Sequence, residues 1–242
     1  MSVFPLMPVT MDLKEELMEQ LELETVFTIP YINVEVDEST VVSWIIMAVF
    51  TVLAIILTRN LKVEGKLTKK QLILEVCMEK LINFFDGILA GKGKKYAPWL
   101  MSMAIFIGAS NIIGIFGFKP PTKSMQSTAA MAITSIILVE IAGIRERGLK
   151  GHLKSFAEPV WVVAPINLLE LIIKPLSLCM RLFGNVLGAF IIMELLKSIL
   201  LIQILQLPAA FSLYFDLFDG ILQAYIFVFL TAMYVQEAVE VE

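Results

Sequence analysis

Cysteine, histidine and charged residues are all scarce in this sequence, and each scarcity excludes a class of protein. The two cysteines, Cys77 and Cys179, lie far apart, and His152 is the only histidine. A disulfide framework or a zinc site needs more thiols or imidazoles at short spacing, so we expect neither, and no cofactor. Charged residues make up 17% of the chain, whereas an ordinary soluble domain has roughly 25%. An ordinary soluble domain is therefore excluded.

Apolar residues are abundant instead, at 58% of the chain, with a mean hydropathy of +0.81. They collect in runs, and a helix needs about 20 apolar residues to cross a bilayer. No linker rich in Pro, Gly or Ser divides these runs. The sequence therefore predicts an all-α polytopic membrane protein with a single membrane domain over residues 41–242.

Five apolar segments predict membrane-embedded helices: 41–57, 97–118, 128–143, 159–207 and 209–235. The last two are separated by Pro208 and are long, which predicts a tilted helical hairpin that carries the ion path over 159–235. In segment 71–89, charged and apolar residues alternate at helical spacing. This pattern predicts an amphipathic helix on the cytoplasmic face. We expect no strands, because no strand pattern is evident.

The charges are strongly segregated along the chain. Residues 1–40 carry nine acidic side chains and one basic one, Lys14, whereas 59–95 carry nine basic ones. Basic loops stay on the cytoplasmic side of a membrane. We therefore expect the acidic segment 1–40 outside, the basic loops at 59–95 and 145–154 inside, and a cytoplasmic C-terminus. This pattern suits a bacterial plasma membrane.

Arg181 is the most conspicuous charge, because apolar residues flank it on both sides. A charge at the bilayer centre costs roughly 2.5–3.5 kcal/mol on insertion scales, and a guanidinium does not lose its proton. At 100° per residue, Glu170, Lys174, Asn185 and Gly188 lie on the same face as Arg181. This face is polar or small throughout, so another helix can approach it closely.

The last apolar segment carries a comparable polar stripe. Asp216, Asp219 and Gln223 follow one another at offsets of three and seven residues, which places them on one helical face. Two polar stripes on neighbouring helices of an apolar hairpin indicate a hydrated ion path.

Segment 174–185, KPLSLCMRLFGN, resembles the signature of subunit a of the bacterial rotary F-type ATP synthase. The agreement extends in the same order to 110–114 (SNIIG), to 165–167 (PIN) with Glu170, and to 223–227 (QAYIF). An ordered set of matches is far more specific than one arginine in an apolar helix.

The resemblance implies a membrane stator that is not an enzyme on its own. Its partners would be a ring of c subunits, the peripheral-stalk b subunits, the rest of the ATP synthase complex and the lipid bilayer, with no nucleic acid. Arg181 would be the essential charge that faces the ring, with Gln223 as its neighbour. Two offset half-channels would carry protons or sodium ions, and the ring would set which of the two.

Some positions depart from the family or leave alternatives open. The family often has a carboxylate or histidine nine residues after the arginine, where this chain has Phe190; Glu194, one turn further, is a substitute. Asp216 lies where the family has Glu or His. Glu170 either lines the cytoplasmic half-channel or only pairs with Lys174. The remaining polar residues have simpler interpretations. We expect Asp219 to be solvated near a helix end and Asn111 to make an interhelical hydrogen bond. We expect Glu140 to lie at the membrane interface and His152 to be exposed.

A secondary ion-coupled transporter is the main alternative. Transporters of that kind usually have paired halves with broken helices at corresponding positions. No internal repeat is visible in this sequence.

Overall fold

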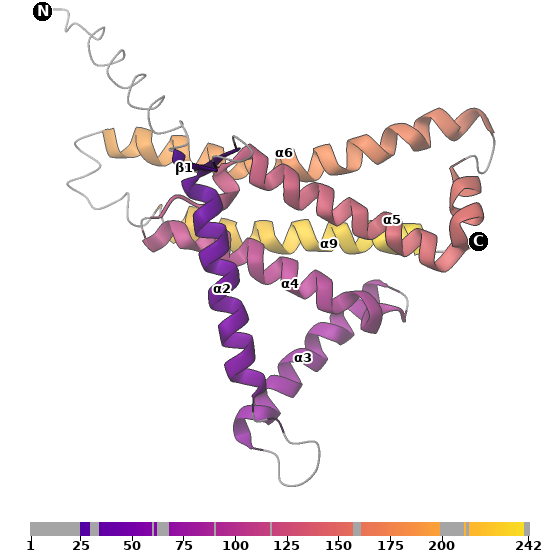
Figure 1. Cartoon of the computed structure of the whole chain (residues 1–242), viewed down its shortest axis with the longest axis horizontal. Helices are drawn as coiled ribbons and strands as arrows, with labels where there is room; N and C mark the ends of the chain where they lie inside the picture. The colour runs from indigo at the N-terminus through magenta and orange to yellow at the C-terminus, as the bar shows by residue number, and fades with distance from the viewer. Residues whose placement is uncertain are drawn as a thin grey trace, which may run out of the picture.

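The computed structural model describes most of the chain, namely residues 25–29, 34–59, 61, 68–89, 91–116, 118–156, 161–198, 211 and 213–239. Four long helices run side by side along the long axis of the molecule (Figure 1): α4 (Gly93–Ile112), α5 (Met125–Ser155), α6 (Ala164–Ser198) and α9 (Gly220–Val239). They form the bundle that positions the candidate site.

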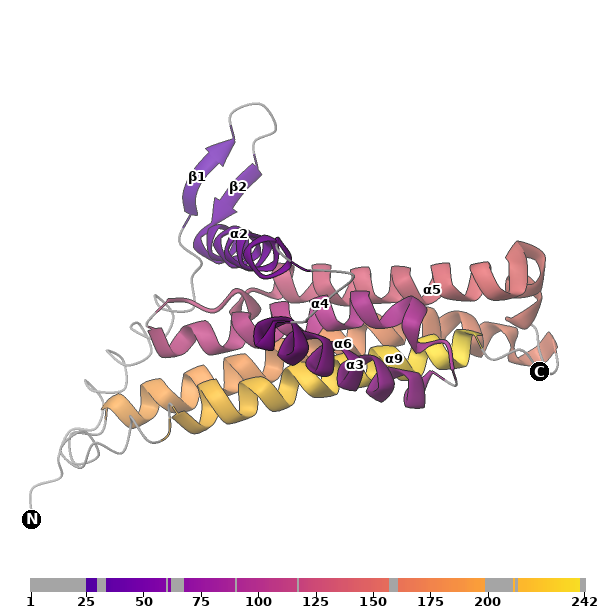
Figure 2. The same cartoon turned by 90° about the horizontal axis from the view of Figure 1, so that it is seen from below.

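Two further helices lie at the side of this bundle. The helix α2 (Glu38–Thr58) crosses the long helices at a steep angle and extends beyond them (Figures 1 and 2). From its far end, α3 (Lys69–Ile88) leads back to the start of α4. The Thr68 hydroxyl caps α3 by accepting a hydrogen bond of 3.4 Å from the backbone N–H of Gln71.

The predicted all-α polytopic membrane fold is confirmed. Five helical stretches are long and apolar enough to cross a membrane: Glu38–Thr58, Lys94–Phe116, Met125–His152, Trp161–Met193 and Leu213–Val239. Among the described helices α3 is not one of them, because charged residues interrupt it, as expected for an amphipathic helix. The chain is therefore a multi-pass membrane protein.

The length of α6 agrees with a tilted helix. Its 35 residues make a rod of roughly 52 Å at about 1.5 Å per residue, whereas the hydrocarbon core of a bilayer is about 30 Å thick. In the two views α6 and α9 lie alongside each other, as the predicted hairpin requires. The turn that joins them at Pro208 lies outside the described residues.

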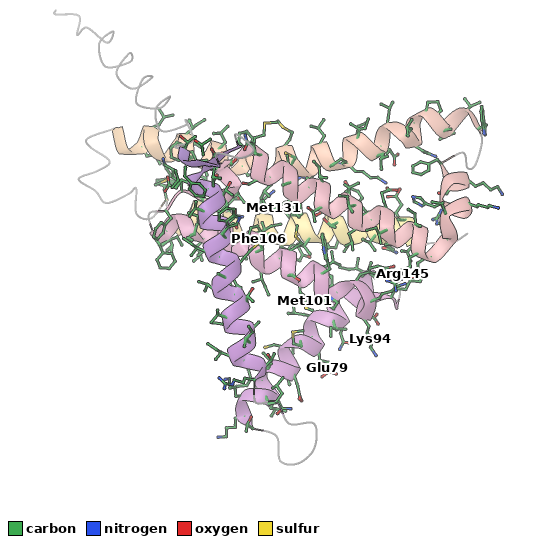
Figure 3. All side chains as sticks on the ribbon, in the orientation of Figure 1. Glu79, Lys94, Met101, Phe106, Met131 and Arg145 are labelled. Atoms are coloured by element: carbon green, nitrogen blue, oxygen red, sulfur yellow. The ribbon has the colours of Figure 1, made fainter. Side chains whose placement is uncertain are left out.

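The core of the bundle lies between α4, α5 and α9, where Leu100, Ile107, Ala132, Phe227 and Val235 are almost inaccessible to solvent. The labelled side chains of Met101, Phe106 and Met131 lie along this part of the bundle (Figure 3). Lys94 and Arg145 lie together near the end where α4 begins and α5 ends. The two basic segments thus meet at one end of the bundle.

Two expectations about secondary structure were wrong. A two-stranded antiparallel hairpin, β1 (Thr25–Ile29) with β2 (Val34–Asp37), precedes α2, although we expected no strands. The last apolar segment begins as a π-helix, η4 (Leu213–Asp219), and becomes α-helical only from Gly220. A π turn holds more residues than an α turn, so α-helical spacing does not predict which of its residues share a face.

Helix α5 is longer than predicted and contains a reversal. It begins at Met125, after the short 3-10 turn η2 (Pro121–Lys123), and Gly148 interrupts it with a φ of 71°. This left-handed conformation is readily available only to glycine. The residues after Gly148 turn away from the axis of α5 (Figure 1), which brings His152 back toward the bundle.

Candidate functional site

Arg181 is exposed on α6, and the apolar side chains of Leu176 and Met180 on the same helix are exposed as well. Among the described residues, its guanidinium has no hydrogen bond, ion pair or aromatic contact. A permanent charge inside a membrane-spanning helix is costly without a partner. Among the described residues, Arg181 is thus a membrane-helix charge with no group of this chain to offset that cost.

One turn after Arg181, a hydrogen bond joins α6 to α9. The Nδ2 of Asn185 donates to the Oε1 of Gln223 over 2.7 Å. Gln223 is buried, with 2% of its surface exposed, and its own Nε2 has no partner among the described residues. An unsatisfied buried amide is a site where an ordered water fits. The structure thus brings together one member of each polar stripe, close to Arg181.

Two turns before Arg181, an ion-pair cluster joins the same two helices. The Nζ of Lys174 lies 3.3 Å from Oε2 of Glu170 and 3.0 Å from Oε2 of Glu237, which belongs to α9. Glu170 therefore pairs with Lys174, as one interpretation of the sequence has it. Glu237 had not been considered, because nothing in the sequence says which residue of α9 reaches Lys174.

A polar cavity of about 210 Å³ opens beside this cluster, between α5, α6 and α9. Its lining includes seven charged or titratable side chains: Glu140, Arg147, His152, Glu170, Lys174, Tyr234 and Glu237. Glu170 thus lines a cavity as well as pairing with Lys174. The cavity lies at the end of the bundle where the basic segments meet.

His152 corrects one expectation. It was expected to be exposed, yet only 8% of its surface is accessible, and its Nε2 lies 2.7 Å from Oε2 of Glu140. Glu140, expected to be interfacial, is partly exposed and lines the cavity. The reversal at Gly148 folds the basic segment back onto α5, and that glycine is the one signal in the sequence for this contact.

The C-terminal end of α9 is held by basic side chains from two other helices. Arg147 Nη2 donates to the backbone carbonyl of Glu237 at 3.1 Å, and Lys92 Nζ donates to that of Val239 at 3.4 Å. Cations are favourable at a helix C-terminus, where carbonyl groups lack intrahelical partners. Lys92 and Lys95 also form ion pairs with Glu146 of α5. These contacts fix the end of α9 on which Glu237 lies.

At the opposite end of the bundle, a chain of buried hydrogen bonds connects α4, η2 and α9. Thr122 Oγ1 donates to Oδ1 of Asn111 at 2.7 Å, and Asn111 Nδ2 donates to the carbonyl of Gly220 at 2.9 Å. Asn111 therefore makes the interhelical hydrogen bonds expected of it. Nearby, the buried Lys123 holds its Nζ 3.4 Å from the ring centroid of Phe190, a cation–π contact.

Three carboxylates of the predicted outer path are less completely described. Asp219 is half-buried at the end of the π-helix η4. Glu194 lies in α6 and Asp216 in η4, but their side chains lie outside the described part of the structure. No group of three His, Cys, Asp or Glu side chains placed to hold a metal ion occurs in the described ranges.

Comparisons with known proteins agree on one family. A family model described as "ATP synthase A chain" matches residues 40–236. An ATP synthase subunit a from Moorella thermoacetica is 37% identical over 199 residues, which cover 81% of this chain and 88% of that protein. An ATP synthase subunit a 1 from Syntrophotalea carbinolica is 33% identical, over 82% of this chain and 84% of that protein. An ATP synthase subunit a 1 from Crocosphaera subtropica is 30% identical, over 86% of this chain and 90% of that protein.

Proposed function

Because the chain belongs to the ATP synthase A chain family, we propose that it is the stator that couples ion flow to rotation of a c-subunit ring, with Arg181 as the essential charge. The chain is a non-catalytic membrane subunit of the ATP synthase complex. The observation that supports the role of Arg181 best is its exposure, without a partner among the described residues, on a helix long and apolar enough to span a membrane.

A fixed guanidinium on this face performs two tasks. It favours the ionised form of a ring carboxylate that comes to rest opposite it, so the carboxylate releases its ion. At about 4 Å and an effective dielectric constant near 20, such a pair gains about 4 kcal/mol. That energy corresponds to about a thousand-fold in the release equilibrium. The same charge repels a cation that moves along the face, so ions cross only when the ring turns.

The polar features on either side of Arg181 suit two half-channels. The cavity lined by Glu170, Lys174 and Glu237 lies toward the start of α6 and would be the cytoplasmic half-channel. The outer half-channel would run at the other end, past Glu194, Asp216 and Asp219. Asn185 and Gln223 join the helices between these regions, where they would hold water close to Arg181.

The same proposal assigns partners and orientation. The exposed face around Arg181 would meet the c ring, and other lipid-exposed faces would meet the peripheral-stalk b subunits. The chain would lie in a bacterial plasma membrane, with the acidic segment 1–40 outside and the C-terminus in the cytoplasm. The basic segments at one end of the bundle support this orientation.

The test replaces Arg181 in the complete complex reconstituted into liposomes. Arg181→Ala should abolish ATP-driven ion pumping and ATP synthesis while the complex still assembles. Arg181→Lys should restore little, because an ammonium lacks the planar fork and can deprotonate when buried. Lys150→Gln removes an exposed charge from the cytoplasmic segment and is the matched control.

Coupled pumping by Arg181→Ala at the rate of the Lys150→Gln control would reject this assignment. The transporter alternative has its own signature. A transporter would move ions after purification without a ring of small subunits, whereas a stator subunit needs the ring.

A further inference from the structure

His152 stands apart among the residues that line the inner cavity. It is the only histidine in the chain, it is more than nine-tenths buried, and its Nε2 lies 2.7 Å from Oε2 of Glu140. Its other ring nitrogen, Nδ1, is buried with no hydrogen-bond partner among the described residues. Imidazole is the side chain whose charge ordinarily changes near neutral pH. A buried imidazole with one free nitrogen, in the wall of a polar cavity, is a group that can exchange protons.

The backbone of α5 is shaped to accept this ring. A Cβ added at Gly143 would lie only 2.7 Å from both Cε1 and Nδ1 of His152, so a larger residue would displace the imidazole. On another side, the ring of Phe156 packs edge-on at a centroid distance of 5.2 Å. The imidazole is therefore held in one orientation, with Nε2 directed to Glu140.

The other charged groups around the cavity already have partners of their own. On α6 and α9, Lys174 is shared between Glu170 and Glu237. On α5, Arg147 donates to the backbone carbonyl of Glu237. On its own segment, His152 is followed by Lys154, an exposed residue that does not line the cavity. Glu140 is thus the carboxylate that bonds the imidazole.

We propose that His152 and Glu140 form one proton-exchange site at the cytoplasmic end of the inner half-channel, an assignment that rests on the proposed function. With a neutral imidazole, Nε2–H donates to the Glu140 carboxylate and the pair carries one negative charge. A hydronium ion in the cavity gives one proton to the pair, on Nδ1 or on the free carboxylate oxygen, and becomes water. The pair is then neutral overall, and the reverse step returns the proton to water. Because the two groups share a hydrogen bond, a proton added to either one changes the charge of the pair as a whole.

The experiment uses the intact complex in liposomes made permeable to protons by an uncoupler, so that ATP hydrolysis requires proton exchange but builds no gradient. The variants are His152→Gln, Glu140→Gln and Gly143→Ala, with Lys150→Gln as the control. The glutamine at 152 keeps an N–H donor for Glu140 but cannot titrate. The measured quantity is the part of the ATP hydrolysis rate that a carboxyl-modifying reagent inhibits. It is followed across the neutral pH range, with and without added imidazole.

A positioned proton-transfer group typically contributes a factor of 10²–10⁴, and cavity water offers a slower route, so we expect His152→Gln to lose about ten-fold in rate. The inflection near neutral pH in the plot of its hydrolysis rate against pH should disappear. Free imidazole should restore much of the rate. Gly143→Ala should behave similarly, because it displaces the ring while His152 is retained. Lys150→Gln should match the unaltered chain.

Three results would overturn the assignment. One is a rate and pH profile of His152→Gln equal to those of Lys150→Gln. Another is a slow His152→Gln complex that keeps its inflection and does not respond to imidazole, which indicates a structural role only. The third is full activity in both Glu140→Gln and Gly143→Ala. If Arg181→Ala abolishes ATP-driven pumping in liposomes without the uncoupler, only this inference fails and the proposed stator function stands.

Discussion

Gly220 marks the closest approach of α9 to α4, and we expect a single methyl group there to destabilise the chain. An alanine Cβ at this position would lie 2.9 Å from Cβ of Asn111, nearer than nonbonded carbon atoms approach. The neighbour is held in place, because Asn111 bonds Thr122 at 2.7 Å and the Gly220 carbonyl at 2.9 Å. The helices must therefore separate, or Asn111 must give up these hydrogen bonds.

Opposing effects determine the size of the change. Alanine instead of glycine in a helix gains about 0.5–1 kcal/mol. Overpacking a close contact costs about 1–3 kcal/mol, and each lost hydrogen bond costs about 1 kcal/mol. With both bonds of Asn111 lost, Gly220→Ala should lower the free energy of unfolding by about 2–4 kcal/mol.

The assay is thermal unfolding of the purified chain in detergent, with Gly87→Ala as the control. Gly87 lies within α3, and a Cβ there meets no atom within 4 Å, so that variant should be neutral or slightly stabilised. A second change separates sterics from hydrogen bonding. Asn111→Ala keeps the clashing Cβ and should not rescue Gly220→Ala, whereas Asn111→Gly removes it and should recover part of the loss. Equal midpoints for Gly220→Ala and Gly87→Ala would refute the close approach.

Two further predictions concern topology and the outer path. In a chain with Cys77 and Cys179 replaced, Ser2→Cys should react with an impermeant thiol reagent added outside intact cells, and Lys94→Cys should not. Labelling of Lys94→Cys from outside would reject the proposed orientation. Asp216→Asn and Glu194→Gln should each slow passive ion conductance through complexes stripped of the catalytic head, and Asp216→Asn should have the larger effect. Unchanged conductance in both variants would show that the outer path does not run between these two residues.

Hydrophobic runs were sufficient to predict the helices, because a chain in lipid must satisfy its backbone hydrogen bonds within each helix. The same reasoning anticipated that α3 would be amphipathic. It placed the end of the next helix at residue 118, whereas α4 ends at Ile112 and continues only as the 3-10 turn η1 (Ile113–Phe116). The hairpin before α2 was missed, although Val34 and Val36 alternate with acidic residues in a period-two pattern typical of a strand.

The candidate site was predictable only where it follows α-helical spacing. Spacing placed Asn185 near Arg181 on α6, and it placed Gln223 on the helix that faces them. It failed for the cavity, because Glu140 and His152 meet through a reversal of the chain at Gly148. It failed again at η4, where the π-helix changes the rotation per residue between Asp216 and Gln223. Each of these two arrangements depends on an irregular backbone, the reversal at Gly148 or the π-helix η4, and a periodic residue pattern does not predict such irregularities.

A stator must hold its charge still while its partner moves past, and the contacts of α6 and α9 meet this requirement. Lys174 and Asn185 join α6 to α9 on either side of Arg181. In turn, α9 is fixed at its start by Asn111 and at its end by Arg147 and Lys92. These contacts hold α6 against α9 on both sides of Arg181. A sideways force on Arg181 would therefore pass into α4, α5 and α9 through hydrogen bonds and ion pairs.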